Sequence, residues 1–261
     1  MSFYEAMERY YDHIFPLHQN NLVFLEKKLG SSNNKHILDL ACGTGTYTLA
    51  LATRGFRVTG IDLDETMIEL ARQKKREQSP PVDGNGATFI KGDMLKLSAY
   101  LKTVFDGAFC IGNSLVHLET PNGIATALRE TAAVLRRGAI LIVQTVNYDR
   151  VLKHNVNSLP TLENEEQSVS FQRLYSYDAQ KHRILFTGIL TLPDSTSRTN
   201  TIPLYPLQKA ELERILTKAG FAVKGFYGNF AGEPWSEETP ATIVVAAAEI
   251  THPCSSNETN G

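Results

Sequence analysis

The chain has 261 residues, of which 42% are hydrophobic and 21% are charged, and its formal net charge is −2. This length suits one α/β domain with an added element, and it can bury a full core without disulfides or metals. A nucleic-acid partner requires a basic face, so the near-neutral charge argues against one. The three cysteines, Cys42, Cys110 and Cys254, have no zinc or redox spacing, and we predict no metal site.

The N-terminus and the longest apolar run argue against export and membrane insertion. The first residues, MSFYEAMERYYDHIF, carry acids and lack the basic start and unbroken apolar run of a signal peptide. The apolar run at 241–248 is too short to span a bilayer. We therefore expect a cytoplasmic protein without a membrane partner.

The first half of the chain alternates between helix and strand patterns. Residues 3–30 predict one or two amphipathic helices with a break at Pro16. Beyond them we predict strands at 36–40, 56–62, 87–93, 105–113 and 139–146, helices at 46–53, 64–78 and 121–136, and a turn-rich loop at 79–86. Gly138 is placed just past the last of these helices. Such alternation predicts a parallel sheet with helices on both faces.

The pattern changes after residue 150. Apolar and polar residues alternate over 167–192, and a polar break at 178–182 predicts an antiparallel hairpin. A helix follows at 207–219, and two strands at 221–230 and 242–249 close the fold. The polar tail from Pro253 is expected to be disordered.

The segment LDLACGTG (38–45) predicts a buried strand, a glycine turn and the start of a helix. Gly43 and Gly45 let the backbone approach a ligand closely, and the helix N-terminus offers free N–H groups to an anion. That anion is a pyrophosphate in dinucleotide-binding proteins and the carboxylate of the methionine moiety in S-adenosylmethionine (SAM) sites. A plain structural turn is the alternative.

Three further features favour SAM. Asp39 precedes the glycines, where an acid suits a positive amino group and repels a pyrophosphate. Thr48 stands where the dinucleotide fingerprint has its third glycine or alanine. Asp93 follows the third strand, where it can accept a hydrogen bond from an adenine amino group. Asp62 ends the second strand and suits the ribose of either cofactor, although Asp62 and Asp93 could each be helix N-caps.

These motifs carry a resemblance to a known family. LDLACGTG, the acid in GIDLD, the GDM after the third strand and the final strand pair resemble class I SAM-dependent methyltransferases, over about residues 30–150 and the C-terminal helix and strands. The segments CIGNSLVHL (110–118) and NYD (147–149) are similar to the glycine and sarcosine N-methyltransferase branch. The hairpin before the last helix is similar to that branch as well.

The resemblance implies a Rossmann-like, mostly parallel sheet with a closing antiparallel strand and a small antiparallel β excursion. Together with the reading of the glycine turn, it gives these cofactor-binding candidates: Tyr11, Asp39, Ala41, Gly43, Gly45, Asp62, Leu63, Asp93, Met94 and Ile111. We divide the chain into an N-terminal helical lid (1–30), a SAM-binding core (31–150), a substrate-side excursion (151–206), a completing helix and strand pair (207–250) and a disordered tail (251–261).

Asn113 and His117 are the catalytic candidates, because the resemblance places both near the sulfonium. His117 could act as a base or orient the substrate, since its ordinary pKa is near neutrality; the alternative is a histidine that hydrogen-bonds the adjacent loop. Asn113 is expected to shape the strand end. Four tyrosines could form an aromatic wall around a methylated cation, or simply pack: Tyr148, Tyr175, Tyr177 and Tyr205.

One position departs from the resemblance. Glycine methyltransferases have an arginine immediately before NYD that binds the carboxylate of the substrate, and this chain has Val146 there. An aliphatic side chain cannot make that bidentate contact. Arg173 or Arg183 on the hairpin could replace the arginine, or could be ordinary surface groups.

We therefore expect a SAM-dependent methyltransferase that acts on a small molecule, at an amine nitrogen. The alternatives are an NAD-dependent oxidoreductase, which predicts a parallel sixth strand, and a SAM-binding protein without catalysis. Methylation of a protein or tRNA is disfavoured by the lack of a basic surface. The resemblance also points to self-association as a homo-oligomer through the N-terminus or the hairpin.

Overall fold

The computed structural model describes residues 2–32, 34–77 and 86–249. The predicted loop at 79–86 falls almost wholly outside these residues, and the predicted disordered tail falls entirely outside them. Within the described residues, no helix is long and apolar enough to cross a membrane.

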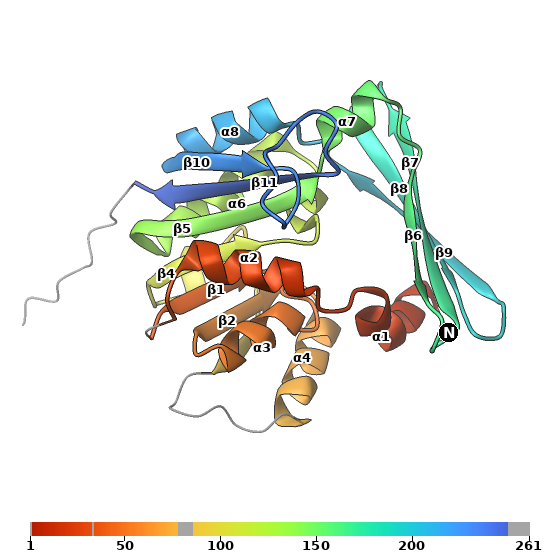
Figure 1. Cartoon of the computed structure of the whole chain (residues 1–261), viewed down its shortest axis with the longest axis horizontal. Helices are drawn as coiled ribbons and strands as arrows, with labels where there is room; N and C mark the ends of the chain where they lie inside the picture. The colour runs from red at the N-terminus through yellow and green to blue at the C-terminus, as the bar shows by residue number, and fades with distance from the viewer. Residues whose placement is uncertain (1, 33, 78–85, 250–261) are drawn as a thin grey trace, which may run out of the picture.

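A seven-stranded sheet forms the centre of the molecule, with the strand order β10-β11-β5-β4-β1-β2-β3 (Figure 1). The strands are β1 (His36–Leu40), β2 (Arg57–Asp62), β3 (Ala87–Lys91), β4 (Phe105–Cys110), β5 (Leu135–Val146), β10 (Phe221–Tyr227) and β11 (Ala241–Ala248). The first five run parallel to one another, and β11 runs antiparallel to both β5 and β10. The predicted mostly parallel sheet with a closing antiparallel strand is thereby confirmed.

Helices cover both faces of this sheet. They are α2 (Gln19–Leu29), α3 (Thr46–Thr53) and α4 (Glu65–Glu77) on one face, and α5 (Leu97–Tyr100), α6 (Pro121–Ala133) and α8 (Lys209–Lys218) on the other. Because both faces are covered, all five residues of β1 are buried, including His36 and Asp39. Because β1 to β4 run parallel to one another, their carboxyl ends meet at one edge of the sheet.

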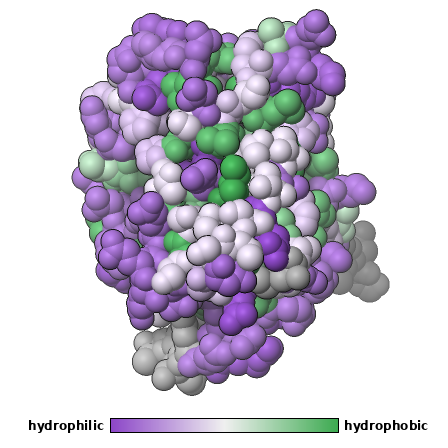
Figure 2. All heavy atoms as spheres, turned by 90° about the vertical axis from the view of Figure 1, so that its right-hand side faces the viewer, coloured by the Kyte–Doolittle hydropathy of each residue, from purple (hydrophilic) through white to green (hydrophobic). Residues whose placement is uncertain are grey.

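A second sheet stands beside the first and consists of four antiparallel strands. They are β6 (Ser158–Asn164), β7 (Val169–Asp178), β8 (Arg183–Thr191) and β9 (Ser197–Leu204), in that order. Helix α1 (Phe3–Ile14) lies against its inner face, where Met7 and Ile14 join an apolar cluster with Phe171 and Leu190 (Figure 1). The outer face, turned toward the viewer in Figure 2, carries a band of apolar and weakly polar residues between hydrophilic rims.

The largest differences from the predicted elements are at the start of β5 and in the second sheet. Helix α6 ends at Ala133 and β5 already begins at Leu135, so Gly138 lies inside the strand with φ +80° instead of after the helix. Leu135 pairs with Phe105 at the start of β4, and the register shifts just beyond that pair. The predicted hairpin is also only the central half of the four-stranded sheet, because β6 and β9 flank it.

Candidate functional site

A cavity of about 400 Å³ opens at the carboxyl ends of the parallel strands. Its volume is in the range of small-molecule sites. Four consecutive strand ends and helix α1 contribute its lining, which is Tyr11, Ala41, Gly43, Ile61, Asp62, Leu63, Asp64, Met67, Gly92, Asp93, Met94, Gly112, Ser114, His117 and Leu118. Eight of the twelve predicted site residues are in this set. The cavity therefore lies where ligands bind in open α/β sheets.

The turn after β1 forms one wall of the cavity. Gly43 has φ +54° and Gly45 has φ +74°, a left-handed conformation that glycine adopts without strain. A Cβ on Gly43 would lie 3.3 Å from the hydroxyl of Tyr11, and one on Gly45 would lie 2.5 Å from the ring of Phe89. The backbone of Gly43 is thus open to a ligand, whereas Gly45 is required for packing and does not line the cavity.

Backbone donors hold the two aspartates that end β2 and follow β3. Asp62 accepts the N–H of Gly43 at 2.8 Å through Oδ2 and the N–H of Asp64 at 3.0 Å through Oδ1. Asp93 accepts the N–H of Leu95 at 2.9 Å. Asp64, rather than Asp62, binds the first turn of α4 by accepting the N–H of Thr66. The helix-cap alternative therefore does not account for Asp62.

Asp39 lies behind the cavity wall. It is 3% exposed, and its Oδ2 accepts a 2.5 Å hydrogen bond from Thr48 Oγ1. Burial raises the pKa of Asp39 to about 8, a rise that the Thr48 hydrogen bond opposes and nearby Asp62 reinforces. Thr48, at the position of the third glycine in a dinucleotide fingerprint, therefore serves as the partner of this buried acid.

Comparisons with known proteins agree with this geometry. The family profile described as a methyltransferase domain matches residues 37–138. The chain is 27% identical to the glycine/sarcosine N-methyltransferase of Aphanothece halophytica, over 83% of this chain and 77% of that protein. It is 26% identical to the glycine/sarcosine/dimethylglycine N-methyltransferase of Actinopolyspora halophila, again over 83% of this chain but only 36% of the other protein.

A solved structure matches most of the fold. SAM-bound CalS10, an amino pentose methyltransferase from Micromonospora echinaspora, superposes with a TM-score of 0.67 at 18% identity, over 95% of this chain and 97% of that one. The profile and the relatives decide the class. This chain is a class I SAM-dependent methyltransferase.

The cavity of the methyltransferase fits SAM in the chemistry of its lining. The exposed backbone of Gly43 and the carboxylates of Asp62 and Asp93 supply the polar partners. Leu63 is 69% exposed at the cavity, where it offers an apolar face to a flat base, and Met94 adds a second apolar group. The methyltransferase has no group of residues suited to hold a metal ion within its described ranges.

Tyr11 brings helix α1 into the site. Its hydroxyl lies close to Gly43, and its ring packs 5.0 Å from that of Phe15. Burial raises the pKa of Tyr11 to about 12, and the charges of Asp62 and Asp12 add to the rise. The phenol therefore remains protonated at neutral pH and closes one side of the cavity as a neutral hydrogen-bond donor.

His117 and Asn113 both follow β4 but differ in their surroundings. The His117 side chain faces the cavity and makes no hydrogen bond to any other described residue, so the loop-bonding alternative is not what the structure shows. Partial desolvation lowers its pKa, against the opposing charge of Glu119.

Asn113 lies outside the cavity lining: its Nδ2 donates to the Tyr148 hydroxyl at 3.0 Å, and its Oδ1 accepts the N–H of Val146 at 2.9 Å. Ile111 also lies outside the lining and packs against the core.

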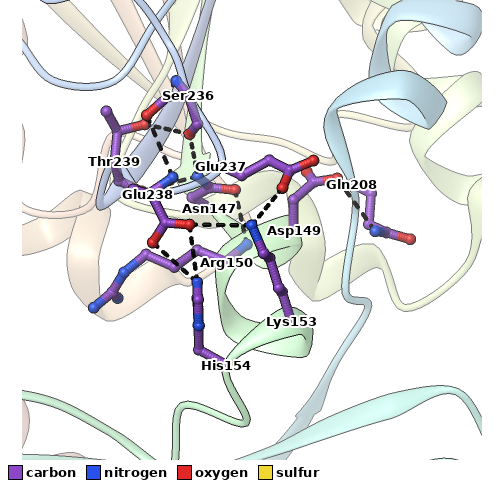
Figure 3. A network of polar contacts seen from close by, with 10 residues as sticks. All are labelled: Asn147, Asp149, Arg150, Lys153, His154, Gln208, Ser236, Glu237, Glu238 and Thr239. Carbon is purple, nitrogen blue, oxygen red and sulfur yellow. Dashed lines mark hydrogen bonds and ion pairs between the residues drawn. The ribbon is translucent and has the colours of Figure 1, made fainter.

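The NYD motif holds secondary elements together. Asn147 is fully buried and donates to the carbonyls of Ser236 and Thr239 (Figure 3). It also caps the short helix α7 (Tyr148–Lys153), while Asp149 accepts hydrogen bonds at the start of α8. The resemblance in this motif therefore reflects how the strand end is anchored, and neither residue lines the cavity.

The four tyrosines do not gather at the cavity. Tyr148 and Tyr175 are buried and stacked, with ring centroids 6.4 Å apart. Tyr177 pairs with His182, and Tyr205 donates to Glu211. The packing alternative is the one that the structure shows.

Neither hairpin arginine replaces the missing one. Arg173 donates twice to the carbonyl of Pro160. Arg183 lies over the ring of Tyr205, with its Nε 4.0 Å from Glu119. Both guanidinium groups are engaged away from the cavity lining.

Sequence reasoning missed several lining residues. Met67 lies one helical turn beyond Asp64, so the helix predicted after GIDLD carried the signal for it. Ser114 and Leu118 flank His117 in the short 3₁₀ helix Ser114–Leu118, an element that its apolar spacing did not predict.

Proposed function

We propose that this methyltransferase transfers the methyl group of SAM to the nitrogen of a small-molecule amine that carries no carboxylate near the reacting nitrogen. One observation supports this most directly: the cavity lining contains three aspartates and, among the described residues, no lysine or arginine. Such a lining suits SAM, which is itself a cation, and offers no cationic partner to an acceptor carboxylate. Val146, in place of an arginine, agrees with this.

The choice of nitrogen is supported by the relatives, which are named as N-methyltransferases. We assign Asp62 to the ribose, Asp93 to the adenine side and the turn at Gly43 to the methionine end of the cofactor. SAM supplies a methyl group that is already activated on a sulfonium, so the protein has mainly to position the acceptor. Tyr11 restricts access of water, and His117, neutral at pH 7, accepts a hydrogen bond or a proton from the amine.

The competing functions make different predictions for the fold and for turnover. The NAD-dependent oxidoreductase alternative predicted a parallel sixth strand, but β11 is antiparallel to β5. A SAM-binding protein without catalysis would bind SAM and release no S-adenosylhomocysteine (SAH) beyond a control without acceptor. The formal net charge of −2 disfavours tRNA methylation, because binding a phosphate backbone requires a basic surface.

The test is a turnover assay with methyl-labelled SAM and paired acceptors. Simple amino sugars and amino alcohols form one arm, and glycine and sarcosine form the other. We expect kcat/KM for the best acceptor without a carboxylate to exceed that for glycine by about tenfold or more, since an unpaired carboxylate is costly to bury. Glycine or sarcosine as the best acceptor would overturn the proposal.

A further inference from the structure

Helix α1 touches two parts of the molecule through two different kinds of contact. Its apolar residues pack against the four-stranded sheet, where Met7 and Ile14 meet Phe171. Its polar contact with the cofactor side passes through Asp12, the residue after Tyr11. Asp12 therefore hydrogen-bonds α1 to the turn beside the cavity.

Asp12 belongs to a compact polar cluster with Thr44, Thr46 and Lys74. Oδ1 of Asp12 accepts from Thr44 Oγ1 at 2.6 Å and from Thr46 Oγ1 at 3.0 Å. Nζ of Lys74 donates to Asp12 Oδ2 at 2.8 Å, to Thr46 at 2.9 Å and to Thr44 at 3.1 Å. Oδ1 of Asp12 thus has two partners, Oδ2 has one, and the ammonium group has three, unlike an isolated surface ion pair.

The cluster joins three elements that are far apart in the sequence. Thr44 lies in the glycine turn, between Gly43 and Gly45, and is 2% exposed. Lys74 lies in the last turn of α4, and Asp12 lies near the end of α1. The same bonds that hold α1 therefore also fix the turn whose backbone lines the cavity.

We propose that Asp12 and Lys74 are positioning residues that latch α1 over the cofactor site and so set how tightly SAM and SAH are held. With the latch formed, Tyr11 covers Gly43 and the cavity is closed on that side. Breaking the latch lowers the fraction of molecules with α1 in place, and the apparent affinity falls by that fraction. The inference rests on the assignment of this cavity to SAM.

The experiment measures the dissociation constant of SAM by calorimetry and the dissociation rate of SAH by stopped flow, with the full chain. The variants are Asp12→Asn and Lys74→Met. Lys75→Met is the matched control, because Lys75 is the next residue of α4 and is exposed. Because the pair is partly exposed, we expect each latch variant to weaken SAM binding by about three- to fivefold and to speed SAH release similarly, with Lys75→Met near wild type.

The signs of the two effects separate the latch from long-range electrostatics. Asp12→Asn removes a negative charge and Lys74→Met removes a positive one, so a pure field effect on a charged ligand would have opposite signs. The latch predicts weaker binding in both, and a double variant no worse than the single ones. It also predicts that salt weakens SAM binding to the wild type more than to Lys74→Met.

Three results decide between the explanations. SAM binding by Lys74→Met equal to that of Lys75→Met would overturn the latch, as would opposite signs for the two latch variants. Failure of the wild type to bind SAM would instead overturn the assignment of the cavity. Thermal unfolding of every variant is recorded. If Lys74→Met unfolds early, Lys74→Gln takes its place.

Discussion

The backbone N–H of Gly43 donates a 2.8 Å hydrogen bond to Oδ2 of Asp62, and so ties the turn after β1 to the end of β2. The other oxygen, Oδ1, accepts the N–H of Asp64. One carboxylate thereby orders two adjacent walls of the cavity. Its removal should disturb both the shape of the site and the charge presented to a ribose.

Substitution of this carboxylate should impair cofactor binding. We expect Asp62→Ala to weaken SAM binding by about 10- to 100-fold, because a charged hydrogen-bond acceptor is lost. Asp62→Asn, which keeps the shape, should show a smaller loss. Glu69→Ala removes an exposed acid from α4 and serves as the control in the same calorimetric titration. Unchanged affinity in Asp62→Ala would mean that the cofactor assignment is wrong.

His117 should influence the rate modestly and affect its dependence on pH. We expect His117→Gln to lower kcat by less than about tenfold and to leave the SAM dissociation constant unchanged, since positioning dominates. The lowered pKa of His117 keeps it neutral to a lower pH than an ordinary histidine. Wild-type kcat should therefore fall only at a pH below the ordinary pKa of histidine. The His117→Gln variant should lose this acidic limb of the profile.

The control for this profile is His154→Gln, which changes an exposed histidine at the C-terminal end of α7 that pairs with Glu238. It should retain the wild-type profile. A loss of kcat above about a thousandfold in His117→Gln would instead identify an obligatory base.

Val146 offers a test of acceptor choice. Val146→Arg should raise kcat/KM for glycine by about tenfold or more, because a guanidinium can bind a carboxylate through two parallel hydrogen bonds. Val146→Lys supplies the charge without the planar fork, and should gain less. The measurement is SAH release at saturating SAM. Equal glycine turnover in the wild type and Val146→Arg would remove the functional meaning of the resemblance at this position.

The buried acid Asp39 should make stability depend on pH. Its folded pKa is raised to about 8, so the native state binds more protons than the unfolded state between about pH 4 and pH 8. The free energy of unfolding should therefore fall as the pH rises through that window. Asp39→Asn should remove part of the fall, making the variant more stable relative to wild type at pH 8 than at pH 5 by about 1–3 kcal/mol. Urea unfolding at the two pH values measures the difference, and an equal effect of the substitution at both would contradict it.

The sequence was most informative where both faces of a strand are buried. The runs at β1 and β2, each followed by a glycine or an acid, predicted strand ends that the structure brings to one edge. The two edge strands of the second sheet gave no such signal, because β6 contains Pro160 and β9 contains Pro203 among polar residues. Proline is tolerated at a sheet edge, where one side of the strand needs no partner.

Tertiary contacts explain what local patterns could not predict. Leu135 looked like the end of a helix but pairs with Phe105, and this contact begins β5 early. Asp12 and Lys74 are 62 residues apart, and neither occurs in a recognisable motif. Asp39 was expected at the cofactor, whereas in the structure its side chain accepts a hydrogen bond from Thr48 of α3. Whether it also contacts the cofactor stays a prediction.

The most direct test of the central claim is a calorimetric titration of the pure protein with SAM, SAH and NAD. The cavity lined by Asp62 and the Gly43 turn should bind both adenosyl compounds and not NAD. Binding of NAD without either adenosyl compound would contradict the assignment.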